Sequence, residues 1–553
     1  MALVRRPNRK HVPIVGLLIA FVSSLSVAAT ASGQASTSEV GEGAWSQLGD
    51  DIDGDANSPG FGTSVAVSDD GTRVVIGSMP AEPGTDELSY VQVHEWDGSA
   101  WQQLGNNITV TTAGFNLFGY SVAISGDGNR IAVGDPYGPD GYDIGAVGGA
   151  ETGPEDSTPP GAVRVFDWDG STWQQVGETI EGTGSVTEFP PEFFGWSVAL
   201  SSNGERVIAG STLQARAFDY DSVNGWTQTG NAIGSTDGVN GAVAISADGN
   251  RVAVGPGVLA GLFGVGEEFE GGEEFGGGEE FDLQVFDYDV SDGWIQVGSD
   301  FDGEGISGWS VAMSADGNRV VFTNVDISAE SASVRVMDYI DGDWNQVGDT
   351  ISATESSGDA LGYSAAMSAD GTRIAFTGAF SLGSNLSETS YLQVGEWNGS
   401  AWVYDVELAP GLTLAMSADG NLIASGNVFA IFGGAEEQYP VLVYALPASV
   451  SFDVGEGEYA PVAMSSDRGS DVTLPTSEPT RTGYTFLGWN TASDGSGTSY
   501  AAGDTYTLPA SDSDTLHAQW SANTTTTTTV PVEETPPAAE PAEPVSDTPT
   551  FTG

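Results

Sequence analysis

The feature that most constrains this chain is a short phrase that returns seven times. It reads SVAVSDDGTRVVIG from Ser64, SVAISGDGNRIAVG from Ser121 and SVALSSNGERVIAG from Ser197, and the later copies begin at Ala242, Ser310, Ser364 and Thr413. Each copy has two runs of alternating apolar and polar residues around an Asp-Gly or Asn-Gly pair, which is a strong β-hairpin signal. A unit repeated at this length is typical of a solenoid, a propeller or an array.

Each repeat continues into two further strands. The third strand reads VQVHEW at Val91 and VRVFDW at Val163, and similar segments follow in the other repeats. The period of two predicts half-buried strands rather than helices. The fourth strand is marked in each repeat by a tryptophan: Trp45, Trp101, Trp173, Trp226, Trp294, Trp344 and Trp402.

The order of the segments predicts a closed ring. The chain after its leader starts with a lone fourth strand, Trp45 to Gly49, and the last repeat ends with a third strand, Val441 to Leu446. If the N-terminal strand completes the last sheet, no sheet edge is left open. We therefore predict an all-β fold, a seven-bladed β-propeller over residues 43–447 closed by the N-terminal strand. An open β-solenoid is the alternative, and it would leave Trp45 unpaired and need a cap at each end.

The lengths of the connections differ between the two ends of the predicted ring. The turns between strands one and two and between strands three and four stay short, whereas insertions such as Asp135–Pro160 and Pro256–Phe281 fall between strands two and three. Insertions also occur between the fourth strand of one repeat and the first strand of the next. In a propeller these connections and those between strands two and three lie at the same end of the ring. Because binding residues are concentrated on loops held by a rigid scaffold, we expect function at this loop-rich end.

Short motifs beside the repeats resemble a known family. Phe61-Gly62, Phe118-Gly119 and Phe194-Gly195 stand just before SVA, and Val133 to Pro136 reads VGDP. These motifs resemble the FG-GAP repeats of propellers such as integrin α-chain heads. The Asp-rich calcium loop of that family is a bare turn here, so calcium binding in the loop is not implied. SADGTRIAF, which begins at Ser368, is similar to the propeller repeat of TolB-type proteins and implies the same architecture.

A different pattern begins near Val450. The segment LPTSEPTRTGYTFLGWN, followed by LHAQW, resembles the Listeria–Bacteroides repeat of bacterial surface proteins. The resemblance implies a small β-grasp-like module over residues 449–520, of a kind found in cell-envelope and secreted proteins. The residues that carry it are Thr480, Arg481, Thr482, Gly483, Tyr484, Phe486, Gly488, Trp489 and Trp520. We expect its aromatic residues to form a small core rather than a platform for sugars.

The two ends of the chain indicate export. Residues 1–31 combine basic residues, an apolar run and Ala29-Thr30-Ala31, which together are typical of a secretory signal peptide. No later segment is apolar and long enough to predict a membrane span. Residues 521–553 are rich in Thr, Pro and Glu, so we expect a disordered tail. The predicted location is secreted or at the cell envelope.

Charge excludes several classes of partner. The 77 acidic and 15 basic residues give a net charge of −62, which disfavours nucleic acids and anionic lipid surfaces. The same charge suits a chain that stays soluble in a saline habitat. We expect the protein to be a monomer. There is no cysteine, and of three histidines one, His11, lies in the leader, so zinc sites and Ser-His-Asp or Cys-His catalysis are not expected.

Two weak candidate sites remain. Asp51, Asp53 and Asp55 have the alternate spacing that lets carboxylates converge on calcium, although Ala56 stands where an EF-hand loop has glycine. A solvated connector between blades is the simpler reading of this segment. Within GEEFEGGEEFGGGEEFD, the residues Phe269, Phe275 and Phe281 are candidate contacts for a partner. Calcium is thus the one cofactor considered.

The sequence therefore predicts a secreted or cell-envelope binding or adhesion protein without catalysis, whose partner is an extracellular glycan or protein. A carbohydrate-active hydrolase with a pair of carboxylates is the first alternative, because paired carboxylates can act as acid and base. A purely structural envelope component is the second, and it would associate with itself and bind no soluble ligand.

Overall fold

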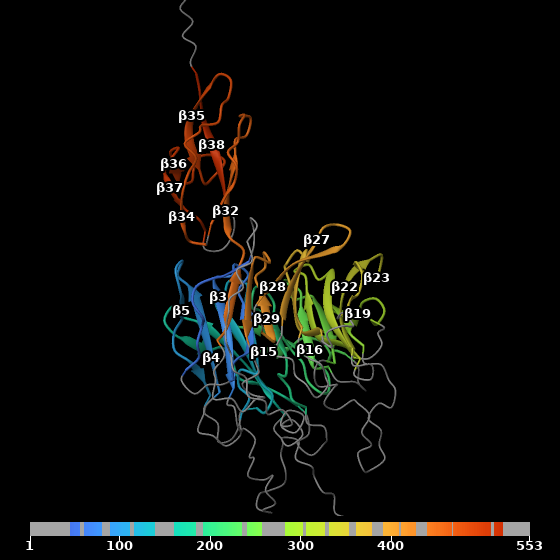
Figure 1. The fold of residues 1–553 in the computed structure, drawn as a ribbon. Helices are drawn as coiled ribbons and strands as arrows, with labels where there is room; N and C mark the ends of the chain where they lie inside the picture. The colour runs from blue at the N-terminus through green and yellow to red at the C-terminus, as the bar shows by residue number, and fades with distance from the viewer. Residues whose placement is uncertain are drawn as a thin grey trace, which may run out of the picture. The chain divides into compact units, whose positions relative to one another are not determined.

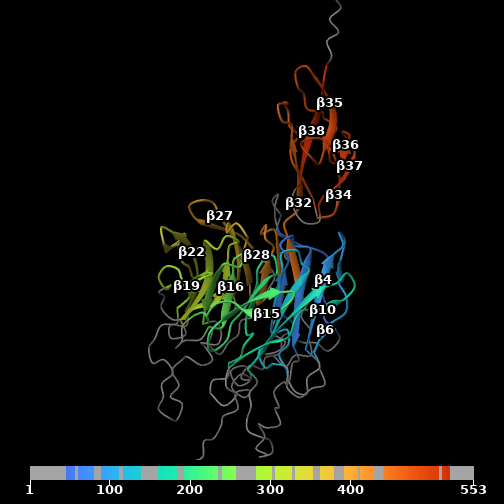
Figure 2. The ribbon, with the colours of Figure 1, turned by 180° about the vertical axis from the view of Figure 1, so that it is seen from behind.

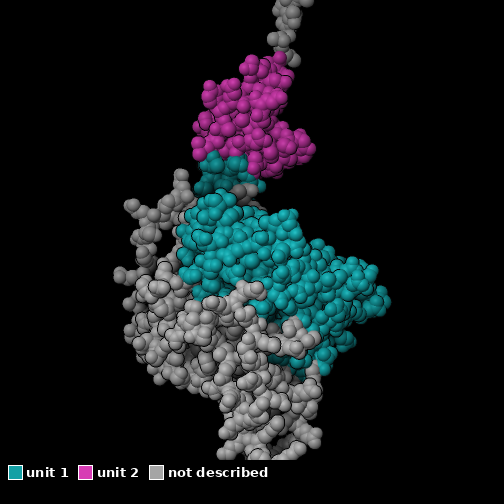
Figure 3. All heavy atoms as spheres, turned by 90° about the vertical axis from the view of Figure 1, so that its right-hand side faces the viewer, with its two compact units in different colours: residues 1–451, 463–473, 505–514 teal, residues 452–462, 474–504, 515–553 magenta. Residues whose placement is uncertain are grey.

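The computed structural model describes residues 45–55, 60–79, 89–110, 116–138, 160–183, 192–234, 240–256, 282–301, 306–326, 331–352, 361–378, 391–408, 411–426, 440–466, 468–509 and 514–523. The regular elements in these residues are all β-strands. The chain divides into two compact units (Figure 3). Residues 1–451, 463–473 and 505–514 form the first, and residues 452–462, 474–504 and 515–553 form the second.

The described residues of the first unit contain seven antiparallel sheets built from the repeats, and Figure 1 labels some of their strands. The first sheet runs β2 (Gly60–Val67), β3 (Arg73–Met79), β4 (Tyr90–Trp96) and β5 (Trp101–Gln103), with β6 (Ile108–Thr109) also paired to β4. The second runs β7 (Ser121–Ile124), β8 (Arg130–Asp135), β9 (Ala162–Trp168) and β10 (Trp173–Gln175), with β11 (Ile180–Glu181) on β9. The third runs β12 (Val198–Leu200), β13 (Arg206–Ala209), β14 (Arg216–Asp221) and β15 (Gly225–Gln228).

The other repeats follow the same order. Figure 2 gives the reverse view, in which β16 and β22 are labelled. The fourth sheet runs β16 (Ala242–Ile245), β17 (Arg251–Gly255), β18 (Gln284–Asp289) and β19 (Gly293–Gln296). The fifth runs β20 (Ile306–Met313), β21 (Arg319–Asp326), β22 (Ser331–Ile340) and β23 (Asp343–Gln346), with β24 (Ile351–Ser352) on β22. The sixth runs β25 (Leu361–Met367), β26 (Arg373–Gly378), β27 (Tyr391–Trp397) and β28 (Trp402–Leu408).

The seventh sheet closes the ring. It runs β29 (Thr413–Met416), β30 (Leu422–Gly426), β31 (Leu442–Ala445) and then β1 (Ser46–Gln47), which supplies the fourth strand from the N-terminal end of the repeats. In the antiparallel pairing, Ser46 lies opposite Ala445 and Gln47 opposite Tyr444. The innermost strands contact one another in chain order, and β29 contacts β2. The fold is therefore a β-propeller, and the predicted closure by the N-terminal strand is confirmed.

A ring of backbone hydrogen bonds links the seven inner hairpins. In each sheet the residue after the serine that ends the inner strand donates its N–H to the equivalent carbonyl of the next sheet, at 2.7–3.1 Å. The donors, in order around the ring, are Asp69, Gly126, Ser202, Ala247, Ala315, Ala369 and Ala418, and Ala418 donates back to Asp69. Because each N–H and each carbonyl in this ring is paired, no member is left unsatisfied at the crowded axis.

The repeated tryptophans fasten the outer edges of neighbouring sheets. In six sheets the indole N–H of the fourth-strand tryptophan donates to a backbone carbonyl of the preceding sheet, at 2.9–3.1 Å. The donors are Trp101, Trp173, Trp226, Trp294, Trp344 and Trp402. The acceptor for Trp101 is Leu48, which follows β1, so the same bond joins the first sheet to the closing strand. These tryptophans are therefore packing residues.

Glycine is required where neighbouring sheets approach most closely. A Cβ on Gly134 would lie 2.1 Å from the carbonyl oxygen of Gly195 in the next sheet. The Gly195 carbonyl also accepts a hydrogen bond of 2.9 Å from the Ser121 hydroxyl. Phe194, in the Phe-Gly motif, is fully buried. The Phe-Gly motifs thus serve the packing between sheets.

The strands after the repeats fall in both units. β32 (Ala448–Asp453) begins in the first unit, where its residues 448–450 pair with β33 (Met464–Ser466), and ends with Phe452 and Asp453 in the second. Also in the first unit, β34 (Asp471–Thr473) pairs with β37 (Thr505–Thr507). In the second unit, β35 (Tyr484–Asn490) pairs with β36 (Ser499–Tyr500) and with β38 (Asp514–Ala522).

The second unit has a small aromatic core. The Trp489 ring is fully buried, and its centroid lies 4.8 Å from that of Phe452 and 5.2 Å from that of Phe486. The Phe486 ring in turn meets Trp520 at 5.6 Å. These rings pack against one another, as a core requires.

Candidate functional site

Four aromatic side chains gather at the loop-rich end, between the second and third sheets. Tyr120 directly precedes β7 and Trp196 lies just before β12, so both stand at the start of an inner strand. Their ring centroids are 4.5 Å apart. Phe193 lies 5.9 Å from Trp196 and 5.9 Å from Tyr137, which follows β8. We call Tyr120, Tyr137, Phe193 and Trp196 the aromatic cluster.

The cluster is mostly buried, and Tyr120 is its most accessible member. Phe193, Trp196 and Tyr137 are 3–7% exposed, whereas Tyr120 is half-buried. Phe193 has a φ of 49°, a left-handed conformation that is uncommon for a bulky residue and costs about 1–3 kcal/mol. The surrounding packing must therefore hold Phe193 in place. Strained residues of this kind are concentrated at binding sites.

The aromatic cluster was not predicted from the sequence, although a signal was present. The residue immediately before the repeated phrase is aromatic in four repeats: Tyr120, Trp196, Trp309 and Tyr363. Tyr120 and Trp196 stand where inner strands begin, at the loop-rich end. Aromatic residues also recur in the third and fourth strands, where they serve packing, so an aromatic residue at a repeat position does not by itself indicate a site.

Two buried ion pairs lie beside the cluster. Arg164 on β9 donates to the carboxylate of Asp135 at 3.3 Å, and Arg216 on β14 pairs with Glu192. The four side chains are 0–7% exposed. Each guanidinium also stacks on a Phe-Gly phenylalanine, with Arg216 4.1 Å from the Phe194 ring centroid.

The two pairs have distinct electrostatics. Burial raises the pKa of Asp135 to about 6, although Arg164 and the Leu117 N–H, which donates to the carboxylate at 3.2 Å, oppose the shift. Burial also lowers the pKa of Arg216, against the attraction of Glu192. Both carboxylates are bound to arginine, an arrangement that suits a rigid support better than a paired acid and base. This end thus combines aromatic rings with fixed, oriented charges.

The structure gives the proposed calcium site no support. Asp51 accepts a hydrogen bond of 2.8 Å from Gln47, and Asp55 accepts one of 2.6 Å from Asn107. In the part of the chain that the structure describes, which includes Asp53, no three acidic or histidine side chains are grouped to hold a metal ion. The outer two carboxylates, Asp51 and Asp55, thus accept hydrogen bonds from side-chain amides.

Two other predictions from the sequence concern three phenylalanines and one histidine. Phe269, Phe275 and Phe281 lie outside the described residues. His94 on β4 is 8% exposed, and burial lowers its pKa to about 4, so it is neutral at physiological pH. Its Nε2 lies 3.0 Å from the Gln92 side-chain oxygen. His94 is therefore a packing residue, as its place in the repeat predicts.

Comparison with known proteins identifies the C-terminal module. The family model described as the Listeria-Bacteroides repeat domain matches residues 449–519, and such repeats are typical of bacterial surface proteins. A protein of Evansella cellulosilytica named "Putative membrane protein" is 44% identical over 73 residues, which are 13% of this chain and 10% of that protein. The chain thus spans about a tenth of the length of this relative. In the described residues, no helix is long and apolar enough to cross a membrane.

Solved structures similar to this chain include propellers. The Kuenenia stuttgartiensis hydrazine synthase is 12% identical, with a TM-score of 0.39 over 72% of this chain and 97% of that one. The β-propeller domain of Myceliophteria thermophila Cps50 (Swd1) is 12% identical, with a TM-score of 0.43 over 72% of this chain and 98% of that one.

Proposed function

We propose that this chain is an exported, non-enzymatic binding protein of the bacterial cell surface, in which a seven-bladed FG-GAP-like propeller presents its loop-rich end to an extracellular glycan. The aromatic cluster carries the proposal. Tyr120 and Trp196 come from the starts of neighbouring inner strands at the end from which the long connections leave, and the half-buried Tyr120 ring is backed by the buried Trp196 ring at 4.5 Å. Sugars bind proteins by stacking on such rings, because an aromatic side chain joins an apolar face to a polar tip.

Two further features support the proposal. The leader-like segment 1–31 and the Listeria-Bacteroides repeat at 449–519 both fit an exported chain. The ion pairs Arg164–Asp135 and Arg216–Glu192 hold the phenylalanines behind the cluster in fixed positions. A rigid support lowers the entropy lost when a ligand is ordered on the surface.

The test is binding of the labelled full chain without its leader to an array of glycans and envelope polysaccharides. The array is read in calcium and again in chelator. We expect binding that Tyr120→Ala weakens at least about fivefold, since one well-placed aromatic contact contributes about 1 kcal/mol.

Tyr288→Ala is the matched control for this test. Tyr288 is half-buried like Tyr120, but it lies near the end of β18 and packs on Trp294 at 5.2 Å, away from the loop-rich end. If both variants lose binding equally, the cluster is not the site. If no glycan binds the unmodified chain, the glycan proposal fails. Release of sugar from any polysaccharide by the unmodified chain would contradict the absence of catalysis.

A further inference from the structure

The turn between β27 and β28 in the sixth sheet carries an acceptor motif for N-glycosylation. Residues 398–400 read Asn-Gly-Ser, and N-x-Ser/Thr is the triplet whose asparagine receives oligosaccharides in exported chains. Glu396 stands two residues before the asparagine, and an acidic residue at this distance belongs to the longer motif that bacterial oligosaccharyltransferases recognise. The chain has four N-x-Ser/Thr triplets, which begin at Asn107, Asn385, Asn398 and Asn523. The triplet at Asn398 is the one that also has the acidic residue.

The turn holds Asn398 by its oxygen and leaves its nitrogen exposed. Oδ1 of Asn398 accepts hydrogen bonds from the Ser400 N–H at 3.0 Å, the Ser400 hydroxyl at 2.9 Å and the Ala401 N–H at 3.0 Å. Nδ2 of Asn398 donates to none of the described residues. Residues 398–400 are all exposed, and a Cβ on Gly399 would meet no atom within 4 Å. The nitrogen to which a sugar would be joined is therefore accessible.

The equivalent turn of the second sheet shows that these hydrogen bonds do not require an asparagine. Asp169 accepts the same bonds, from the Ser171 N–H at 2.8 Å, the Ser171 hydroxyl at 2.7 Å and the Thr172 N–H at 2.8 Å. These donors, the Ser171 hydroxyl first, lower the pKa of Asp169 to about 2 because they stabilise its charged form. A charged acceptor forms the stronger hydrogen bonds. The amide of Asn398 is thus the weaker choice for the turn, and what it adds is an exposed nitrogen.

The triplet at Asn107 differs because its asparagine is held by both ends of the amide. Nδ2 of Asn107 donates to Asp55 at 2.6 Å, and Oδ1 accepts hydrogen bonds from Gln92 at 3.1 Å and Gln103 at 2.8 Å. A sugar on this nitrogen would displace the bond to Asp55. The triplets at Asn385 and Asn523 extend outside the described residues.

We propose that Asn398 is an N-glycosylation site of the exported chain, with a lipid diphosphate-linked oligosaccharide as the donor. In the transfer, Nδ2 of Asn398 attacks the anomeric carbon of the first sugar, so that a C–N bond forms and the C–O bond to the diphosphate breaks. The lipid diphosphate leaves with the electron pair, and the nitrogen loses one proton to a base of the transferase. No oxidant or reductant takes part.

The site shares only export of the chain with the proposed function, and it does not depend on glycan binding at the aromatic cluster. The β27–β28 turn joins strands three and four, at the end of the ring that has the short turns, whereas the aromatic cluster lies at the loop-rich end. Asn398→Gln should therefore leave binding to the glycan array unchanged. Failure of either proposal can be recognised without the other.

The test is mass spectrometry of the full chain purified from its own host and cut with glutamyl endopeptidase. Cleavage after Glu396 and Glu407 releases residues 397–407, which contain Asn398. We expect this peptide to carry the mass of an oligosaccharide, and its fragments to place the sugar on Asn398. Ser400→Ala should abolish the modification, whereas Ser400→Thr should keep it because threonine preserves the hydroxyl of the motif. The peptide that contains Asn107 should have its unmodified mass.

The second sheet offers a matched gain of the site. Residues 167–171 read Asp-Trp-Asp-Gly-Ser, so Asp169→Asn creates the longer motif there. A Cβ on Gly170 would meet no atom within 4 Å, so this turn is as open as the turn at Gly399. We expect Asp169→Asn to acquire a second glycan.

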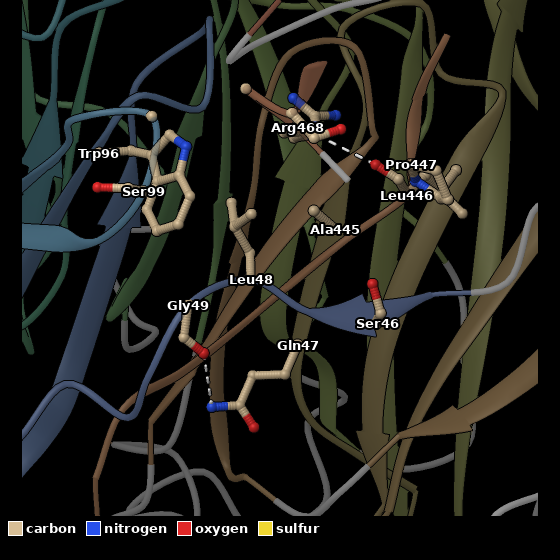
Figure 4. Close-up of a pocket in the computed structure, with 13 residues that line it drawn as sticks. Ser46, Gln47, Leu48, Gly49, Trp96, Ser99, Ala445, Leu446, Pro447 and Arg468 are labelled. Carbon is tan, nitrogen blue, oxygen red and sulfur yellow. Dashed lines mark hydrogen bonds between the residues drawn. The ribbon is translucent and has the colours of Figure 1, made fainter. Parts of the chain in front are cut away.

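The first sheet is a poorer place for this experiment, although its residues 95–99 read Glu-Trp-Asp-Gly-Ser. Ser99 and Arg468, both labelled in Figure 4, line one small cavity. A Cβ on Gly469 would lie 2.5 Å from the Gly98 carbonyl oxygen. The segment around Arg468 thus lies against this turn, whereas the turn of the second sheet is open.

Four results would overturn the proposal. The first is the unmodified mass for residues 397–407 in the chain from its own host. The second is the small mass gain of deamidation, a hydrolysis common at Asn-Gly pairs, without any sugar. The third is a sugar that persists in Asn398→Gln or in Ser400→Ala, which would place it on another residue. The fourth is an Asp169→Asn chain without a second glycan, which would show that the motif in an open turn is not recognised.

Discussion

Removing the Arg468 side chain should destabilise the propeller, although this residue lies outside the repeats. The Arg468 side chain is 2% exposed, donates to the carbonyls of Leu446 and Asn421, and lies 3.7 Å from the carboxylate of Asp419. A hydrogen bond from a charged donor contributes about 1.5–3 kcal/mol. Two such bonds at 3.2 and 3.3 Å are at the weak end of that range, and the partly exposed Asp419 adds little. We expect Arg468→Ala to lower the free energy of unfolding by about 3 kcal/mol.

Urea unfolding of the full chain, followed by tryptophan fluorescence, measures this loss. The two compact units can unfold separately, so each transition must be fitted by itself. Arg481→Ala is the control, because Arg481 pairs in the second unit with Glu456, which is 82% exposed. An exposed pair contributes at most about 1 kcal/mol. If Arg468→Ala shifts the propeller transition no more than Arg481→Ala does, Arg468 does not stabilise the seventh sheet.

Two other predictions concern the ring itself. Because the pKa of Asp135 is raised from 3.8 to about 6, the folded chain binds more protons than the unfolded chain between these values, so this group lowers the free energy of unfolding as pH rises. Urea titrations of the natural chain and of Asp135→Asn give the difference between their free energies of unfolding. This difference, natural chain minus variant, should fall by about 3 kcal/mol from pH 3 to pH 7. A difference that does not change with pH would contradict the assigned burial of Asp135. Gly134→Ala should lower the free energy of unfolding by about 3 kcal/mol, because the new Cβ would lie 2.1 Å from the Gly195 carbonyl oxygen. In Gly170→Ala the new Cβ meets no neighbour, so the loss should be about 1 kcal/mol and come from the φ of 94° alone. Equal losses of unfolding free energy in the two glycine variants, measured by the same titration, would show that the contact between the sheets does not require glycine at residue 134.

Much of the propeller could be predicted because its signals are local and repeated. The Asp-Gly turns specify the inner hairpins, and the lone strand at Ser46 has one free edge to pair with, that of β31. The spacing of Asp51, Asp53 and Asp55 suggested convergence, but spacing carries no information about Gln47 and Asn107, which take up the outer carboxylates.

The less predictable features depend on residues that are far apart in the sequence. Trp96 and Ser470 line one cavity although they belong to the first repeat and to the segment that follows the last. The repeats show that Leu422 stands where the other six have arginine, but no pattern in the sequence indicates that Arg468 lies at this corner. Tyr120 and Trp196 could have been found, since their repeat position is visible in the sequence, but their contact depends on the closeness of two adjacent sheets.

The most direct test of the central claim is the glycan array read with three forms of the full chain: unmodified, Tyr120→Ala and Tyr288→Ala. If the loop-rich end of the propeller binds a glycan, the unmodified chain and Tyr288→Ala bind the same glycans, and Tyr120→Ala binds them at least about fivefold more weakly. Equal binding by all three forms would move the site away from the aromatic cluster. Absence of binding by the unmodified chain, in calcium and in chelator alike, would contradict the account of this protein as a surface protein that binds glycans.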